Sequence, residues 1–183
     1  MKKDQLRQLV RAQKTLLSAI DKVNAAESVF RKLESSAAFT LADNILLYLS
    51  LPDELSTREF ISRWAEKKSF FLPRVNGLNL EILPYDKSTL HLGAFRIEEP
   101  AGDELTPVES IDMIVVPAVA YDRNGNRLGR GKGYYDRLLS KSKAIKVGVG
   151  YDFQLVDEIE VEPHDIPVDI VINPSSHIIV RKK

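Results

Sequence analysis

Hydrophobic residues recur every three or four positions at the start of the chain, which predicts amphipathic helices. The first such stretch covers residues 2–20, and its apolar positions form one broad helical face. These positions are Leu6, Leu9, Val10, Leu16, Leu17 and Ile20. Ser18 and Asp21 have the spacing of a capping box, so a second helix is expected to start there and to run to about Ser36.

Near-continuous apolar runs later in the chain predict strands that are buried on both faces, as in a parallel sheet. Pro73 is expected to end or kink one of these strands, and Asn76-Gly77 predicts a turn into the next. The expected strands lie at 44–51, 68–75, 78–85, 112–119, 144–152, within 164–174, and at 177–183. Further helices are expected at 58–67, with Thr57 as the N-cap, and at 134–142.

The alternation of strands and helices predicts an α/β fold of three layers, α/β/α, with a mostly parallel central sheet and an N-terminal helical pair. At 183 residues the chain is long enough for one well-buried core. It shows neither an internal repeat nor a linker, so we expect a single domain over residues 1–183. Residues 92–110 are rich in Gly, Pro and acids. So long a segment is either a functional lid or a plain surface excursion.

Composition narrows the class of protein. Lys+Arg and Asp+Glu are both 26, and this zero net charge argues against a general nucleic-acid binder, which is usually basic. The chain has no cysteine, which excludes disulfides, a thiol nucleophile and cysteine-bound metal. No run approaches the roughly 18 apolar residues of a membrane span, and the first residues lack the apolar core of a secretory signal. We therefore expect a cytoplasmic protein without membrane partners.

The segment from Arg127 to Asp136, RLGRGKGYYD, carries the strongest chemical signal. Its three glycines alternate with cations, and the segment joins a predicted strand to a predicted helix, which favours phosphate binding. The spacing fits neither the P-loop nor the dinucleotide fingerprint. A glycine-rich turn with solvated charges is the alternative. Asp136 could either stabilise the start of the helix or bind Mg²⁺ beside a phosphate, and the spacing leaves both open.

The wider segment VPAVAYDRNGNRLGRGKGYYDRLL resembles the 5-formyltetrahydrofolate cyclo-ligase family, whose pattern is V-P-G-x-A-F-D followed by G-x-R-L-G-x-G-x-G-Y-Y-D. Ala118 replaces the usual glycine and Tyr121 the usual phenylalanine, and neither change removes a donor or a charge. The resemblance extends to the N-terminal K-x-x-L-R, to YLSLPDELST and to LVDEIEVEPHDIPVD, and so covers nearly the whole chain.

This resemblance implies conversion of 5-formyltetrahydrofolate to 5,10-methenyltetrahydrofolate, with ATP as cosubstrate, Mg²⁺ as cofactor, and ADP and phosphate as products. Arg130 and Lys132 would be catalytic and stabilise the transferring phosphoryl group. The implied ATP contacts are Lys3, Arg7, Arg127, Leu128, Gly129, Arg130, Gly131, Lys132, Gly133, Tyr134 and Tyr135. The implied folate contacts are Leu49, Glu54, Phe95, Arg130, Gly131, Lys132, Gly133 and Tyr134. The implied Mg²⁺ ligands are Asp136 and Asp165.

On the first helix, Lys3, Arg7, Arg11 and Lys14 form a basic stripe, for which a solvated face is the simplest interpretation. The resemblance reverses this for Lys3 and Arg7 only. The alternatives are another phosphotransferase on the same scaffold and a non-catalytic nucleotide- or folate-binding protein. Both are disfavoured because the residues expected on the folate side and the phosphate side are present. We expect a monomer that acts on small molecules.

Overall fold

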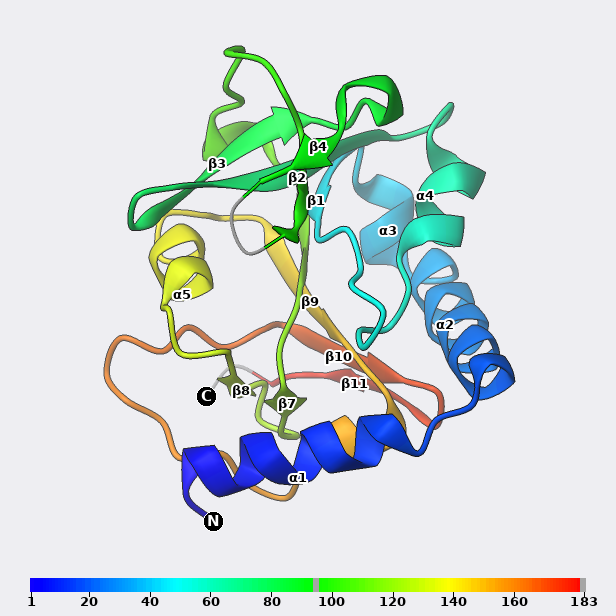
Figure 1. The fold of residues 1–183 in the computed structure, drawn as a ribbon, viewed down its shortest axis with the longest axis vertical. Coiled ribbons are helices and arrows are strands. Elements are labelled where there is room, and N and C mark those ends of the chain that lie inside the picture. The colour runs from blue at the N-terminus through cyan, green and yellow to red at the C-terminus, as the bar shows by residue number, and fades with distance from the viewer. Residues whose placement is uncertain (94–95, 182–183) are drawn as a thin grey trace.

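The computed structural model describes residues 1–93 and 96–181 (Figure 1). The helices are α1 (Lys3–Thr15), α2 (Ala19–Glu34), α3 (Ala37–Leu41), α4 (Arg58–Trp64) and α5 (Tyr134–Leu139). The strands are β1 (Asn44–Leu47), β2 (Ser69–Asn76), β3 (Asn79–Pro84), β4 (His91–Leu92), β5 (Glu98–Glu99), β6 (Met113–Val116), β7 (Ala120–Tyr121), β8 (Arg127–Leu128), β9 (Ile145–Val149), β10 (Ile170–Asn173) and β11 (Ser176–Ile179). Among the described residues, no helix is long and apolar enough to span a membrane.

The central sheet has seven strands in the order β11-β10-β9-β6-β1-β2-β3. The five inner strands are parallel, and the edge strands β3 and β11 pair antiparallel, which confirms the predicted mostly parallel sheet. From β1 the chain moves outward to β2 and β3, whereas from β6 it moves the other way to β9 and β10. The strand order therefore reverses between β1 and β6, and open parallel sheets bind ligands at the carboxyl ends of the strands beside such a switch point.

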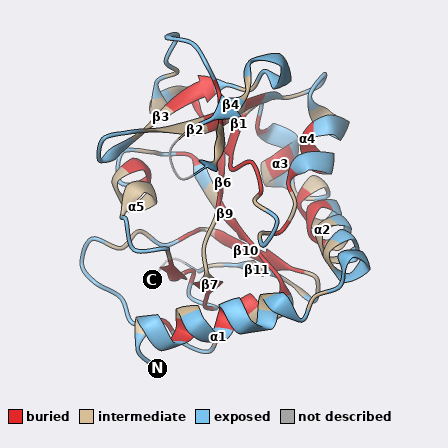
Figure 2. Ribbon diagram, viewed as in Figure 1, coloured by how far each residue is buried: buried red, intermediate tan, exposed pale blue. Residues whose placement is uncertain are grey.

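Helices cover the two faces of the sheet unequally (Figure 1). α2, α3 and α4 pack over one face through residues such as Phe30, Phe39 and Phe60, and α5 packs over the other through Leu138 and Leu139. Figure 2 shows buried residues concentrated along the central strands between these layers. This arrangement is the predicted three-layer α/β/α fold.

The N-terminal helix departs from the prediction in length and packing. α1 ends at Thr15 because the Ser18 hydroxyl accepts a 3.1 Å hydrogen bond from Asp21 N and caps α2 in the expected box. Only Leu6 and Val10 of the predicted apolar face are buried; α1 packs on the narrow β7–β8 ribbon rather than on the broad sheet. The predicted positions that are exposed instead are Leu9, Leu16 and Ile20.

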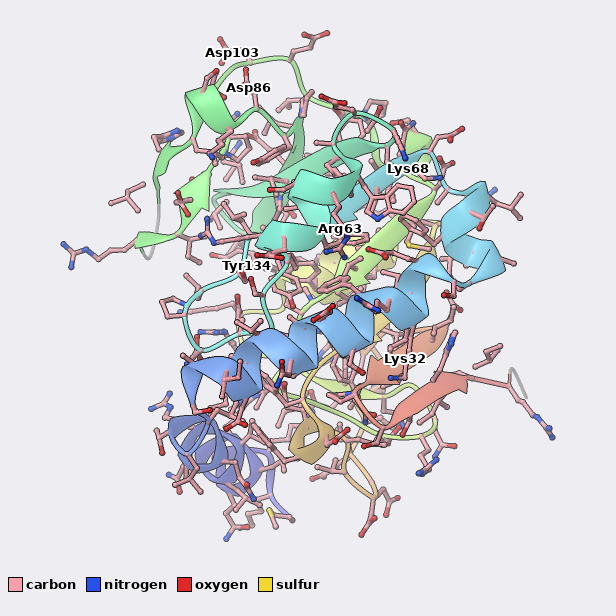
Figure 3. The ribbon with its side chains drawn as sticks, turned by 90° about the vertical axis from the view of Figure 1, so that its right-hand side faces the viewer. Lys32, Arg63, Lys68, Asp86, Asp103 and Tyr134 are labelled. Carbon is pink, nitrogen blue, oxygen red and sulfur yellow. The ribbon has the colours of Figure 1, made fainter. Side chains whose placement is uncertain are left out.

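Three further differences concern two of the strands and one short helix. Pro73 neither ends nor interrupts β2: β1 pairs with β2 only as far as Phe71, so beyond it β2 has only β3 as a partner. The expected strand 112–119 ends at Val116, and a separate β7–β8 ribbon follows. The short helix α3 was not predicted. The Lys68 ammonium, labelled in Figure 3, donates to three carbonyl oxygens at the end of that helix.

One close packing contact gives a stability prediction. The ring of the fully buried Tyr121 lies on Gly148, where a Cβ would come within 2.3 Å of a ring carbon. The Tyr121 hydroxyl also donates to the Val116 carbonyl, so the ring cannot move aside. We expect Gly148→Ala to lower the free energy of unfolding by about 2 kcal/mol through overpacking, as measured by urea denaturation. An unchanged unfolding midpoint would contradict this packing.

Candidate active site

Two loops at the switch point bring together residues that are distant in sequence. The loop 48–57 follows β1, and the segment 117–133 follows β6 and contains the glycine loop, 129–133. The Arg130 guanidinium donates a 3.0 Å hydrogen bond to Glu54 Oε1 across the gap between these loops. Arg130, which is predicted to contact both ATP and the folate, therefore contacts Glu54, which is predicted to contact the folate.

The conformation of the glycine loop depends on its glycines. Gly131 and Gly133 have φ of 99° and 70°, values that residues with a side chain rarely adopt. Gly129 has no such constraint, but a Cβ there would lie 3.3 Å from Arg127 Nη1. Because α5 has only six residues, anion binding at this loop would rest on its amides and cations more than on a helix dipole.

Arg127 is a buried cation beneath the glycine loop. Its side chain is 4% exposed, and it donates a 2.7 Å hydrogen bond to Asp136 Oδ1. Its guanidinium carbon lies 6.0 Å from the centre of the Tyr135 ring. Arg127 Nε is buried and has no hydrogen-bond partner among the described residues. Burying a cation with so few partners is unfavourable, so the surroundings of Arg127 suit a further anion such as a phosphate.

The two predicted metal ligands lie on adjoining segments. Asp136 Oδ1 also accepts a 3.1 Å hydrogen bond from Ile166 N, which holds the residue after Asp165 against Asp136. The Asp165 carboxylate accepts from Glu162 N at 2.8 Å and lies 3.4 Å from Lys3 Nζ. Both aspartate side chains are 19% exposed. Carboxylate oxygens are the donors that Mg²⁺ prefers, so each side chain has the chemistry of a ligand for the implied ion.

Helix α1 lies along the site and presents cations to it. Arg7 Nε donates a 3.0 Å hydrogen bond to the Gly129 carbonyl, which ties the helix to the glycine loop. The prediction of a solvated Lys14 is wrong: its side chain is 10% exposed, and its ammonium lies 3.7 Å from Asp53 Oδ2. Burial lowers the pKa of Lys14, and the neighbouring Asp53 and Glu54 carboxylates oppose this shift. Arg11, by contrast, is exposed as predicted.

Glu54 is held in place from several sides. Its Oε2 accepts from Leu51 N at 2.9 Å, and its carbonyl accepts from the Tyr151 hydroxyl at 3.3 Å. Burial raises the pKa of Tyr151 to about 12, so this hydroxyl stays a neutral donor. Thr57 stands at the N-cap position of α4, but its hydroxyl donates to the Tyr48 carbonyl instead of capping the helix.

The remaining residues predicted to contact ATP or the folate differ in how far their side chains are exposed. Leu49 is 8% exposed and belongs to the core below the loop after β1. Leu128 packs its side chain between α1 and the ribbon, and its carbonyl accepts from Val119 N at 2.7 Å, so a ligand contact would have to involve its backbone. Lys132 is exposed on the glycine loop. Phe95 lies outside the described residues.

Arg137 is a site residue that the sequence reasoning missed. Its guanidinium donates to the Lys132 carbonyl at 2.9 Å and to the Leu78 carbonyl at 2.6 Å, so it fastens the glycine loop to the β2–β3 turn. Tyr134, labelled in Figure 3, reaches the same turn through a 3.4 Å hydrogen bond to the Gly77 carbonyl. The only sequence signal was the position of Arg137 one helical turn after Gly133.

Comparison with known proteins agrees with this geometry. The chain is 33% identical to the 5-formyltetrahydrofolate cyclo-ligase of Haemophilus influenzae over 182 residues, covering 93% of this chain and 97% of that protein. It is 30% identical over 177 residues to the protein of that name from Escherichia coli K12, covering 91% and 97%. The NMR structure of Aquifex aeolicus 5,10-methenyltetrahydrofolate synthetase matches with a TM-score of 0.90 and 34% identity, covering 100% of this chain and 95% of that one. The family model described as the 5-formyltetrahydrofolate cyclo-ligase family matches residues 1–174, and the chain therefore belongs to that family.

Proposed function

We propose that this protein converts 5-formyltetrahydrofolate to 5,10-methenyltetrahydrofolate with ATP and Mg²⁺, releasing ADP and phosphate. The observation that carries the proposal is the contact between Arg130 on the glycine loop and Glu54 on the opposite loop. This contact means that a phosphate on one loop and a folate on the other would meet in one site. The family membership supports the same substrate.

The chemistry explains why ATP is needed. An N-formyl amide is a poor electrophile, and its oxygen is a poor leaving group. In the proposed reaction the formyl oxygen attacks the γ-phosphorus of ATP and ADP leaves, which gives an iminium phosphate. The second folate nitrogen then attacks the formyl carbon and loses its proton, and the carbon–oxygen bond breaks to release phosphate. The substrate oxygen is the nucleophile, so the enzyme has to provide position and charge rather than a covalent group.

The proposed role of each residue follows from its place in the site. Lys3, Arg7 and Arg127 would hold the ATP phosphates, together with the amides of the glycine loop. Arg130 and Lys132 would stabilise charge on the transferring phosphoryl group. Asp136 and Asp165 would hold Mg²⁺, whose chemistry is to neutralise charge on the phosphate oxygens.

The folate side relies on Glu54. Its carboxylate would accept hydrogen bonds from the aminopyrimidinone edge of the pterin. Leu49 and the glycine loop would complete this side, and we propose that the protein acts on these small molecules as a monomer.

The test is a turnover assay with protein, MgATP and 5-formyltetrahydrofolate. We expect an ATP-dependent rise in the near-ultraviolet absorbance of the methenyl product. Reactions without ATP, and with an ATP analogue that cannot transfer its γ-phosphoryl group, are the controls. Absence of an ATP-dependent rise would contradict the proposed function.

A further inference from the structure

Four side chains of alternating charge cross the site from α1 to the glycine loop. The Lys14 ammonium lies 3.7 Å from Asp53 Oδ2, and Asp53 Oδ1 lies 3.7 Å from Arg130 Nη2. Arg130 Nη2 in turn lies 3.0 Å from Glu54 Oε1. The two cations and two carboxylates balance, so the quartet is neutral.

Lys14 is the least exposed member of this quartet. Its side chain is 10% exposed, against 15% for Glu54, 56% for Asp53 and 57% for Arg130. Lys14 lies eleven positions after Lys3 and seven after Arg7, so all three residues lie on the face of α1 that meets the site. Removing an ammonium from water is unfavourable unless a partner compensates, and Asp53 is the partner that the structure supplies.

The proposed function requires the contact between Arg130 and Glu54 to open. Glu54 would turn its carboxylate to the pterin, and Arg130 would turn its guanidinium to the phosphoryl group. When Arg130 leaves, Asp53 and Glu54 remain as neighbouring carboxylates on one short loop. Lys14 is the cation of the quartet that stays beside them and offsets their charge.

We propose that Lys14 is a positioning residue that acts through Asp53 to release Arg130 to the phosphate of ATP. This inference rests on the proposed function and adds a residue to it. The Lys14 ammonium partly neutralises the negative charge of Asp53, so Asp53 holds Arg130 less strongly in the free protein. Without Lys14, two carboxylates compete with the phosphate for the single cation Arg130.

The test measures MgATP binding by calorimetry in the absence of folate. We expect Lys14→Met, which keeps the length of the side chain and removes its charge, to weaken binding about fivefold, as loss of a partly exposed ion pair does. Lys14→Arg should restore affinity. Arg11→Met removes an exposed cation from the same helix and is the matched control, with affinity unchanged. Thermal unfolding of each variant checks that the fold is retained.

The double variant Lys14→Met/Asp53→Asn separates this role from a direct contact with ATP. Since the excess negative charge is then gone, we expect the affinity for MgATP to return to within about twofold of the wild type. A double variant as weak as Lys14→Met would overturn the proposal, because Lys14 would then act on the ligand itself. Unchanged affinity in Lys14→Met would overturn it as well.

A second readout does not depend on ATP. Rotation of the Arg130 guanidinium about its Nε–Cζ bond can be followed by nitrogen-15 NMR in the free protein. We expect slower rotation in Lys14→Met and wild-type rotation in the double variant. If the wild type does not bind MgATP, the proposed function fails. The rotation measurement still decides whether Lys14 weakens the hold of the carboxylates on Arg130. Equal rotation in all variants would overturn this role of Lys14.

Discussion

Replacing Lys132 with alanine is expected to lower kcat at least about a hundredfold, the usual effect of removing a group that stabilises transition-state charge. Lys132 lies exposed on the glycine loop between Gly131 and Gly133, and in the proposed function its ammonium stabilises the transferring phosphoryl group. Its proposed contact forms as charge develops on that group, so the affinity for 5-formyltetrahydrofolate should change no more than about twofold.

The measurement combines steady-state kinetics with calorimetric binding of the folate. Lys143→Ala is the matched control, because Lys143 is exposed just beyond α5 and away from the loop. A kcat near the wild-type value in Lys132→Ala would refute the phosphoryl-stabilising role. A parallel loss of folate affinity would instead indicate that Lys132 serves mainly to bind the folate rather than to stabilise the transferring phosphoryl group.

The second large effect is expected at Asp136, whose removal should lower the free energy of unfolding by about 3 kcal/mol. Asp136 pairs with Arg127, whose side chain is 4% exposed, so Asp136→Ala would leave a buried cation without its partner. Asp165→Ala should lower the free energy of unfolding by less than about 1 kcal/mol, since its partner Lys3 is 27% exposed and 3.4 Å away.

Urea denaturation without Mg²⁺ measures this difference between the two aspartates. Titration of turnover with Mg²⁺ measures the second proposed role, and there we expect both variants to need more metal than the wild type. Equal stability losses would contradict the account of Arg127 as a buried cation that depends on Asp136. Wild-type metal dependence in both variants would remove the two aspartates from the metal site.

Local patterns predicted much of the fold. The capping box of Ser18 and Asp21, the apolar runs of the buried strands and the glycine-rich loop can each be recognised within a short stretch of the sequence. The end of the strand at Val116 and the β7–β8 ribbon that follows were not predicted, because the apolar run 112–119 continues through the break. Only pairing with residues 127–128 separates the ribbon from the strand.

The candidate site, like the fold, could be predicted only where the signal lies in consecutive residues or in the family resemblance. The glycine loop could be identified because its residues are consecutive, and the family resemblance supplied Glu54. The burial of Lys14 could not be predicted: on a helix wheel it resembles the exposed Arg11, and only the loop after β1 distinguishes them. Arg137 was missed for a similar reason, since its partners on the β2–β3 turn lie about sixty residues earlier in the chain.

The fate of the formyl oxygen shows whether that oxygen is phosphorylated, and it can be followed in the turnover assay itself. With oxygen-18 in the formyl group of the substrate, we expect one labelled oxygen in each phosphate released, because that oxygen attacks the γ-phosphorus and leaves with it. Mass spectrometry of the phosphate gives the answer. Unlabelled phosphate accompanying the methenyl product would contradict phosphorylation of the formyl oxygen.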